Sequence, residues 1–343
     1  MEMEVWMKVV AKFGPESAGL IDKPDPIAKG EFVVVKIHSV PMCTEYKGFK
    51  TEGKNDSFGH EAAGEVVEIA QEGTVKVGDR VVVMPHFPCG KCHLCLTGEY
   101  AHCEDDNKIL HATEQTGVTA TFAQYVLKQD WLLVPIPDGM SYDHAGMACC
   151  GLGSTSNAMR LMNVNAFDTV LITGMGPIGL GGVINAVYRG ARVIAVESHP
   201  YRADLAKKLG AAEVVNPHDA DAVDQILDLT GGKGTDKGVE CSAASAAVRL
   251  LIEVTRPKGH ISLIGGIGEV DIQGSSIINK GLTLHGTRHY NLADTPAMLR
   301  MITQVKEQLD TFITHTFPMS QIQDAWALQC THDCGKVVLG AWK

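Results

Sequence analysis

The sequence has no run of basic residues. Lysine and arginine together number 30, against 40 aspartate and glutamate residues, which gives a formal net charge of −10 at pH 7. A surface that binds nucleic acid needs an excess of positive charge on one face, so this composition argues against DNA or RNA as a partner. The chain also contains no internal repeat and no low-complexity linker.

No stretch of the sequence shows the pattern expected of a targeting or membrane-spanning segment. The first residues, MEMEVWMKVV, carry acids where a secretory signal needs bases, and no apolar stretch with a cleavage site follows. The uncharged segment Thr169–Tyr188 is long enough to span a bilayer. Its five glycines, Pro177 and Asn185 favour a strand, a turn and a helix instead. We therefore expect a cytoplasmic protein without a membrane segment, whose ten cysteines favour metal binding over disulfides.

Two kinds of pattern divide the 343 residues. The first 140 residues read as short β-branched runs, such as VVVKIHSV and DRVVVM, separated by Gly and Asp turns. From about residue 146, hydrophobic strands alternate with helices, which predicts a parallel sheet with helices on both faces. We expect an α/β fold class: a β-rich domain over 1–146 and 287–343, and a doubly wound dinucleotide-binding domain over 147–286 inserted into it.

Four cysteines cluster in the segment 88–104. Cys89, Cys92, Cys95 and Cys103 follow the spacing C-x2-C-x2-C-x7-C, and four thiolates on a short loop can close a tetrahedron around Zn²⁺. Ferredoxin iron–sulfur sites use a shorter last gap followed by proline, and the acidic EDD after Cys103 argues against a nucleic-acid zinc finger. Unligated thiols so close together would oxidise. Four thiolates leave no position for substrate, so we predict a structural zinc.

A glycine-rich loop follows an apolar strand and opens a helix. GMGPIG places Gly174, Gly176 and Gly179 in a G-x-G-x-x-G, the pattern that lets a backbone approach a pyrophosphate at a helix N-terminus. Glu197 lies 18 residues after Gly179, where a carboxylate accepts the ribose 2′-hydroxyl of NAD and repels the 2′-phosphate of NADP. Arg202 could hold that phosphate, or lie solvated on the next helix. The pattern favours NAD.

These features together resemble the zinc-dependent medium-chain alcohol dehydrogenases, including sorbitol and threonine dehydrogenases. The resemblance covers nearly the whole chain and rests on FGHEAAGEV, VGDRVVV, the four-cysteine segment and GMGPIG, in that order. It implies a GroES-like catalytic domain, a Rossmann domain, and a catalytic zinc besides the structural one, making two Zn²⁺ per chain. It also implies further contacts with the cofactor, at Pro177, Ile178, Cys241, Ser242, Ile264 and Gly265.

The resemblance identifies ligands for the catalytic zinc residue by residue. Cys43 and His60 match the first two ligands, and Glu61 matches an acid that binds the zinc directly or exchanges with water. In MACCGLGST, Cys150 matches the remaining ligand best, with Cys149 as the alternative. Two thiolates and an imidazole with one open position are typical of a catalytic zinc rather than a structural one.

The residues after Cys43 depart from the family pattern. Relatives commonly place a Ser or Thr two residues after this cysteine, where its hydroxyl starts a proton relay, and a His five residues after it. This chain has Glu45 and Gly48 at those positions, and Thr44 stands one place early. Glu45 could take the proton, bind a second hydroxyl of a polyol, or serve only as an acid near the metal.

These patterns predict a zinc-dependent oxidoreductase that transfers a hydride between a secondary alcohol and NAD. The resemblance favours a polyol, sugar, cyclitol or amino alcohol as substrate, and implies a homodimer or homotetramer. One alternative is an NADPH-dependent reductase of primary alcohols and aldehydes. Another is a zinc-binding member of the family without catalytic activity, since the usual relay is missing.

Overall fold

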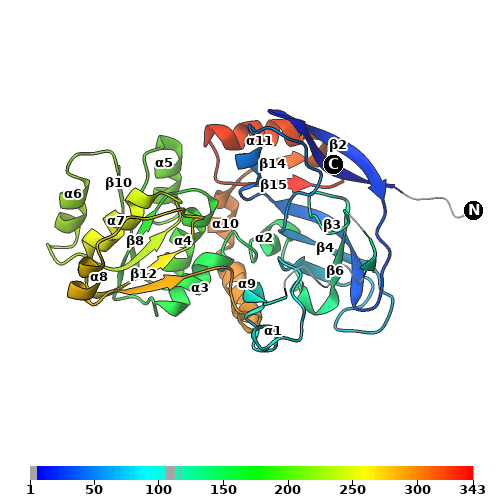
Figure 1. The fold of residues 1–343 in the computed structure, drawn as a ribbon, viewed down its shortest axis with the longest axis horizontal. Coiled ribbons are helices and arrows are strands. Elements are labelled where there is room, and N and C mark those ends of the chain that lie inside the picture. Colours follow the sequence, from blue (N-terminus) through cyan, green and yellow to red (C-terminus); the bar gives the residue numbers. More distant parts are fainter. Residues whose placement is uncertain (1–5, 106–112, 116, 343) are drawn as a thin grey trace, which may run out of the picture. The chain divides into compact units, whose positions relative to one another are not determined.

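The computed structural model describes residues 6–105, 113–115 and 117–342, which form two compact units (Figure 1). The first unit combines the chain up to Gly151 with Asn291–Lys306 and the C-terminal part from Ile313. The second unit consists of Leu152–Tyr290 and Glu307–Phe312, and is thus inserted into the first. The boundaries predicted at residues 146 and 286 stay a prediction; the division into units falls at 151 and 290. Among the described helices, none has the length and apolar character needed to cross a bilayer.

The first unit is rich in β-structure. A seven-stranded sheet has the order β14-β15-β3-β4-β5-β7, with β6 pairing β3, and β1 and β2 form a separate antiparallel pair. The strands of the first unit are β1 (Trp6–Gly14), β2 (Ser17–Pro24), β3 (Phe32–Pro41), β4 (Ala62–Glu68), β5 (Arg80–Val83), β6 (Tyr125–Gln129), β7 (Leu133–Pro135), β14 (Ile313–Pro318) and β15 (Lys336–Gly340). Its helices are α1 (His93–Leu96), α2 (Tyr142–Gly146), α9 (Thr295–Gln304) and α11 (Ile322–Thr331), and α10 (Lys306–Phe312) crosses into the second unit.

Strand β3 is buried on both faces, which explains its unbroken apolar run. Successive side chains of a strand point to opposite faces. Val33, Val35 and Ile37 accordingly pack in the core cluster that contains Trp326 of α11. Phe32 and Val34 pack in a second cluster with residues of β1 and β6. The strand ends at Pro41, two residues before Cys43.

The second unit contains the predicted parallel sheet. Its six strands have the order β10-β9-β8-β11-β12-β13, and every pair is parallel. If the six strands are numbered in chain order, their order in the sheet is 3-2-1-4-5-6, which is the order of a dinucleotide-binding sheet. The direction of this order reverses between β8 and β11, the topological switch point where such sheets bind their ligand. The strands are β8 (Thr169–Thr173), β9 (Arg192–Val196), β10 (Glu213–Val215), β11 (Thr235–Glu240), β12 (Thr255–Leu263) and β13 (Thr283–Gly286).

Helices cover both faces of this sheet (Figure 1). Leu171 of β8 and Ile261 of β12 pack in one cluster with residues of α6 and α7. Ile172 points the other way and lies against α4 at Gly182. Because Leu171 and Ile172 point to opposite faces of β8, helices pack on both sides of this strand. The helices are α3 (Gly153–Leu161), α4 (Pro177–Tyr188), α5 (Pro200–Lys208), α6 (Ala222–Leu229), α7 (Ser245–Val254) and α8 (Gly274–Lys280).

Candidate metal and cofactor sites

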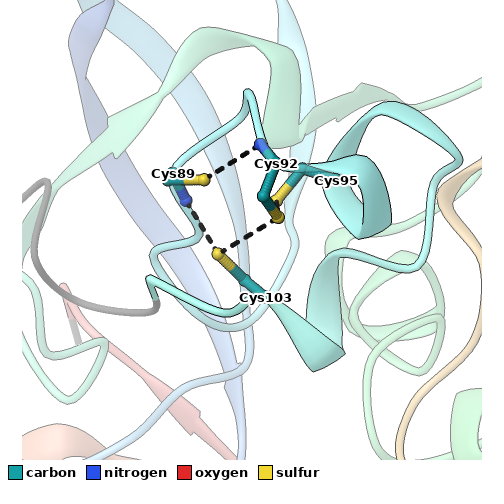
Figure 2. A group of neighbouring side chains, drawn as sticks. All are labelled: Cys89, Cys92, Cys95 and Cys103. Carbon is teal, nitrogen blue, oxygen red and sulfur yellow. Dashed lines mark hydrogen bonds between the residues drawn. The ribbon is translucent and has the colours of Figure 1, made fainter.

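The four cysteines of segment 88–104 converge on one point (Figure 2). The backbone turns back between them through α1 and the short 3-10 helix Tyr100–His102. Backbone N–H groups donate to the sulfur atoms: Cys92 to Cys89 at 3.3 Å, and Cys89 and Asp105 to Cys103 at 3.2 and 3.3 Å. Such donors stabilise thiolates, the form in which sulfur binds a metal.

The sulfur spacing in this cluster fits a zinc ion. The Sγ of Cys92 lies 3.5 Å from that of Cys95 and 3.9 Å from that of Cys103. A tetrahedron with Zn–S bonds of about 2.3 Å requires sulfur atoms about 3.8 Å apart. The sulfur–sulfur distances in this group therefore lie close to the value for a tetrahedral Zn(Cys)₄ site.

A second group of metal-ligating side chains combines Cys43, His60, Glu61 and Cys150, whose ligand atoms all lie within 4.8 Å of one another. Cys43 follows β3, and His60 and Glu61 directly precede β4. The His60 Nε2 lies 3.1 Å from the Cys150 Sγ. Cys149, the alternative ligand, is fully buried and its thiol donates instead to the carbonyl of Val83. The geometry thus brings Cys150 into the group and leaves Cys149 out of it.

Glu45 lies beside this group and contacts two of its members. One carboxylate oxygen lies 3.0 Å from the His60 Nδ1, and the other accepts the backbone N–H of Cys43 at 2.9 Å. Burial raises the pKa of Glu45, but the hydrogen bond and charge of His60, together with hydrogen bonds from the backbone N–H groups of Glu45 and Cys43, outweigh burial, so the pKa is lowered. The Glu45 carboxylate therefore fixes the ring of His60, with Nε2 turned toward Cys150. Thr44, by contrast, is exposed.

The electrostatics of the group favour the metal-binding form of Cys43. Its hydrogen bond with Cys150 lowers the pKa of Cys43 well below the usual value, against the effect of burial. The same bond raises the pKa of Cys150. Burial would lower the pKa of His60, yet hydrogen bonds to Cys43 and Glu45 raise it to about 11. The lowered pKa of Cys43 favours its thiolate, the form in which a cysteine binds a metal.

The sequence-based interpretation missed the partner of Glu61. Lys336, the first residue of β15, lies with its Nζ 2.9 Å from one Glu61 oxygen and 3.2 Å from the other, and both side chains are fully buried. A Glu61 oxygen also accepts the backbone N–H of Cys150 at 3.1 Å. Burial raises the pKa of Glu61 to about 7, although Lys336 acts in the opposite direction. The only signal in the sequence was a lysine at the start of the apolar run KVVLG.

The glycine loop lies between β8 and α4 of the second unit. Gly174 has φ +81°, and a side chain there would meet the backbone of Ser242 at 2.7 Å. A Cβ on Gly179 would lie 1.9 Å from the carbonyl oxygen of Gly174. Gly176 is the N-cap of α4, with Pro177 and Ile178 as the first helical residues, and the space beside it is open. The first and third glycines are therefore needed for the turn and for packing, and the second faces free space.

Glu197 follows β9 at the same end of the sheet. Its carboxylate accepts the backbone N–H of Met175, inside the glycine loop, at 2.7 Å, and those of Ser198 and His199 at 2.8 Å each. Arg202 on α5 is only 7% exposed. The interpretation of Arg202 as a solvated residue is therefore wrong, because its side chain packs against the unit rather than extending into water.

The other residues predicted to contact the cofactor are organised by Glu240, which the sequence-based interpretation also missed. This fully buried residue ends β11, and one carboxylate oxygen accepts the N–H and the hydroxyl of Ser242. The Glu240 carbonyl accepts the N–H groups of Ile264 and Gly265 at 3.0 and 3.2 Å. Cys241 lies between Glu240 and Ser242 in the sequence, and burial raises the pKa of its thiol. The loops after β11 and β12 are thus tied together beside Gly174.

Comparison with known proteins supports this arrangement. Residues 28–138 match the alcohol dehydrogenase GroES-like domain, and residues 177–304 match the zinc-binding dehydrogenase family. L-threonine 3-dehydrogenase of Pyrococcus horikoshii is 33% identical over 353 residues, covering 98% of each chain. D-arabitol-phosphate dehydrogenase of Enterococcus avium is 32% identical over 342 residues, covering 94% of each. The structure of an alcohol dehydrogenase from Thermus sp. ATN1 has a TM-score of 0.88 at 22% identity, covering 97% of this chain and 99% of that one.

The predicted fold class is confirmed by both the strand order and the matched families. The chain therefore belongs to the zinc-dependent medium-chain alcohol dehydrogenases, a family of oxidoreductases that act on CH–OH groups with zinc and a nicotinamide cofactor.

Proposed function

We propose that this enzyme is an NAD-dependent dehydrogenase of small secondary alcohols of the polyol or amino-alcohol class. The observation that carries the proposal is the group formed by Cys43, His60 and Cys150, with Glu61 drawn toward Lys336. Two thiolates and an imidazole, with a carboxylate that can give up the fourth position, are typical of a catalytic zinc rather than a structural one. The relatives are named as dehydrogenases of threonine and of arabitol phosphate, and these names support the substrate class.

Cys43, His60 and Cys150 would hold the catalytic zinc. Zinc bound there supplies a Lewis acid that polarises the substrate hydroxyl. Glu61 would be a fourth ligand or exchange with water, and its ion pair with Lys336 favours the second role. Glu45 would orient His60 through Nδ1, which is the usual task of a carboxylate behind a zinc-bound imidazole. This assigns Glu45 to holding the site rather than to proton transfer.

The four cysteines of segment 88–104 would hold a second zinc ion with a structural role. Their donor set consists only of thiols, and the ring of sulfur atoms leaves no position for substrate. The proposal therefore includes two zinc ions per chain, one catalytic and one structural.

The glycine loop and Glu197 would bind NAD. The open space at Gly176 lies at the N-terminus of α4, where backbone N–H groups and the helix dipole favour a pyrophosphate. The Glu197 carboxylate would accept the ribose hydroxyl and repel a 2′-phosphate. NAD bound there would supply the hydride acceptor.

A panel of alcohols tests the proposed activity. We expect the purified, zinc-loaded enzyme to reduce NAD with at least one small secondary polyol or amino alcohol, measured as absorbance of the reduced cofactor. Primary alcohols of the same size serve as the comparison series. Turnover restricted to primary alcohols or aldehydes with NADPH would favour the reductase alternative. No turnover with any of these compounds, at full zinc content, would favour a role in binding without catalysis.

The choice of cofactor depends on Glu197. Glu197→Ala should raise the ratio of kcat/KM with NADP to that with NAD by at least about tenfold. Like charges in contact cost several kcal/mol, and about 1.4 kcal/mol corresponds to a factor of ten. Glu213→Ala, a change at an exposed residue of β10, is the matched control and should leave the ratio unchanged. An unaltered ratio in Glu197→Ala would contradict the assignment.

A further inference from the structure

The four-cysteine segment contacts the point at which the chain returns from the second unit to the first. Asn291 is the first residue of the first unit after the long stretch of the second. Its side-chain Nδ2 donates to the carbonyl of Thr97 and to a Glu99 carboxylate oxygen, each at 2.8 Å. The N–H of Leu292 donates to the carbonyl of Gly98 at 2.9 Å. Three successive residues of the segment therefore hold two successive residues of the returning chain.

Gly98 is the closest point of this contact. Its φ is +84°, which favours glycine, and a Cβ there would lie 2.2 Å from the Asn291 Oδ1. The same Oδ1 accepts the N–H of Ala293 at 2.9 Å, so Asn291 is the N-cap of the 3-10 helix Leu292–Asp294. Helix α9 follows this helix directly. Both polar atoms of the Asn291 side chain thus join the four-cysteine segment to the start of a helical stretch.

The hydrogen-bond acceptors at residues 97–99 depend on the cysteines for their position. They lie between Cys95 and Cys103, flanked by α1, of four residues, and by the 3-10 helix Tyr100–His102. Isolated helices shorter than about 12 residues are marginal in water. Helix α1 buries only Cys95, and Leu96 is 74% exposed, so apolar burial stabilises this helix little. A metal bound by such a segment supplies much of the free energy that folds it.

Helix α9 packs against the helix that leads to Cys150. One face of α9 is buried and consists of Met298, Leu299, Met301 and Ile302. The helix lies against α2, and Cys150, one of the side chains proposed to hold the catalytic zinc, comes four residues after the end of α2. A shift of α9 would therefore reach the backbone that carries Cys150.

We propose that the metal-loaded four-cysteine segment is a clamp on the returning chain, and that it acts through Asn291. The clamp holds the start of α9 and, through α9 and α2, the backbone of Cys150. The structural zinc then has a defined task, since its loss frees the returning chain and loosens the catalytic metal group. The inference rests on the proposed structural zinc, and it does not require that any alcohol be oxidised.

Hydrogen exchange of backbone amides tests this inference. We expect the amides of Leu292 and of α9 to be protected in the zinc-loaded wild-type enzyme. Asn291→Asp should raise their exchange rates about ten- to a hundredfold, because two hydrogen bonds are lost and a carboxylate is placed against Glu99. This variant keeps the oxygen that caps the 3-10 helix, so the cap is not what is tested. Gly98→Ala should have the same effect, since its methyl group would displace Asn291.

Asn55→Ala is the matched control. Asn55 is an exposed residue of the first unit whose side chain also bonds to a nearby backbone, at Ser57. Its replacement should leave the exchange of Leu292 and α9 unchanged. Cys103→Ser, which removes a ligand from the four-cysteine segment, should raise exchange at the same amides although Asn291 is intact. Amides of the six-stranded sheet show in each sample that the protein remains folded.

Release of zinc to a chelator reports on the link to Cys150. The phase of release that is missing in Cys43→Ser belongs to the catalytic metal group, and it should be several-fold faster in Asn291→Asp than in wild type. An unchanged rate would overturn the link to Cys150.

The clamp itself is refuted if Leu292 and α9 exchange equally fast in wild type, Asn291→Asp and Gly98→Ala. A Cys103→Ser variant that loses zinc yet keeps wild-type exchange at these amides would also overturn the inference, because the metal would then not act on the returning chain. A Cys103→Ser variant that keeps both zinc ions would contradict the structural zinc, and the inference with it. If the expected exchange is found but no alcohol is oxidised, only the proposed activity fails.

Discussion

Cys43→Ser should reduce the zinc content by one ion per chain and lower kcat/KM at least about a thousandfold. The reason is that Cys43 is the thiol of the His60–Cys150 group whose pKa is lowered, and so the one best prepared to bind a cation. A metal that acts as a Lewis acid contributes several kcal/mol to transition-state stabilisation, and each 1.4 kcal/mol is a factor of ten. Elemental analysis and steady-state kinetics of the same preparation provide the measurement.

Cys103→Ser is the control for that experiment, because it removes a ligand from the other cluster. It should also lose zinc, but the main effect should be on stability, since the four-cysteine cluster has no position for a substrate. A chain whose zinc content and turnover both survive Cys43→Ser would refute the assignment of the catalytic metal. If Cys103→Ser abolished turnover while the protein stayed folded, the roles of the two clusters would have to be exchanged.

Lys336→Met should lower the free energy of unfolding by about 3–5 kcal/mol, the usual cost of leaving one member of a buried ion pair without its partner. Glu61 would remain in the interior beside the Cys43 thiolate without its lysine partner. The double variant Glu61→Gln with Lys336→Met should recover most of the loss, since it removes both charges. Urea unfolding at one pH and matched zinc content, over the full mutant cycle, measures the coupling.

Lys8→Met is the matched control for the buried pair. Lys8 pairs with Asp22 at 2.7 Å, and both side chains are about half exposed, at 48% and 52%. A surface pair of this kind contributes at most about 1 kcal/mol. A Lys336→Met variant that loses no more stability than Lys8→Met would show that the burial of Glu61 does not govern the stability of the site.

The elements that could be predicted from the sequence are those whose residues lie close together in the chain. The C-x2-C-x2-C-x7-C spacing and the G-x-G-x-x-G loop each lie within one turn or loop, so local geometry determines their form. The alternation of strands and helices also identified the parallel sheet, because each βαβ unit is local. The ligands proposed for the catalytic zinc were reached through the family resemblance, since Cys43 and Cys150 are too far apart in sequence for spacing to connect them.

The remaining features depend on contacts between distant residues. Glu61 and Lys336 are separated by 275 positions, and no pattern in GKVVLG indicates that its lysine is buried. Lys128 looks like an ordinary outward-facing residue of a strand until the pairing of β6 with β3 buries it. Glu45 had a recognised position but no known partner, and only the placement of His60 shows what its carboxylate contacts. Tertiary burial, which is not a property of local sequence, decides each of these cases.

The pairing of β15 with β3 has a consequence for the order of synthesis. Residues 152–290 leave the ribosome before Lys336 does, so the inserted unit can fold while the sheet that carries Cys43 still lacks its last two strands. During that interval Glu61 lacks its ion-pair partner Lys336, and the side chains proposed to bind the metal are not yet fixed in place. Contacts that bridge hundreds of residues form slowly, so the zinc-binding group should mature last. A nascent chain arrested before residue 336 would therefore be expected to contain a folded nucleotide-binding unit next to an incomplete metal centre.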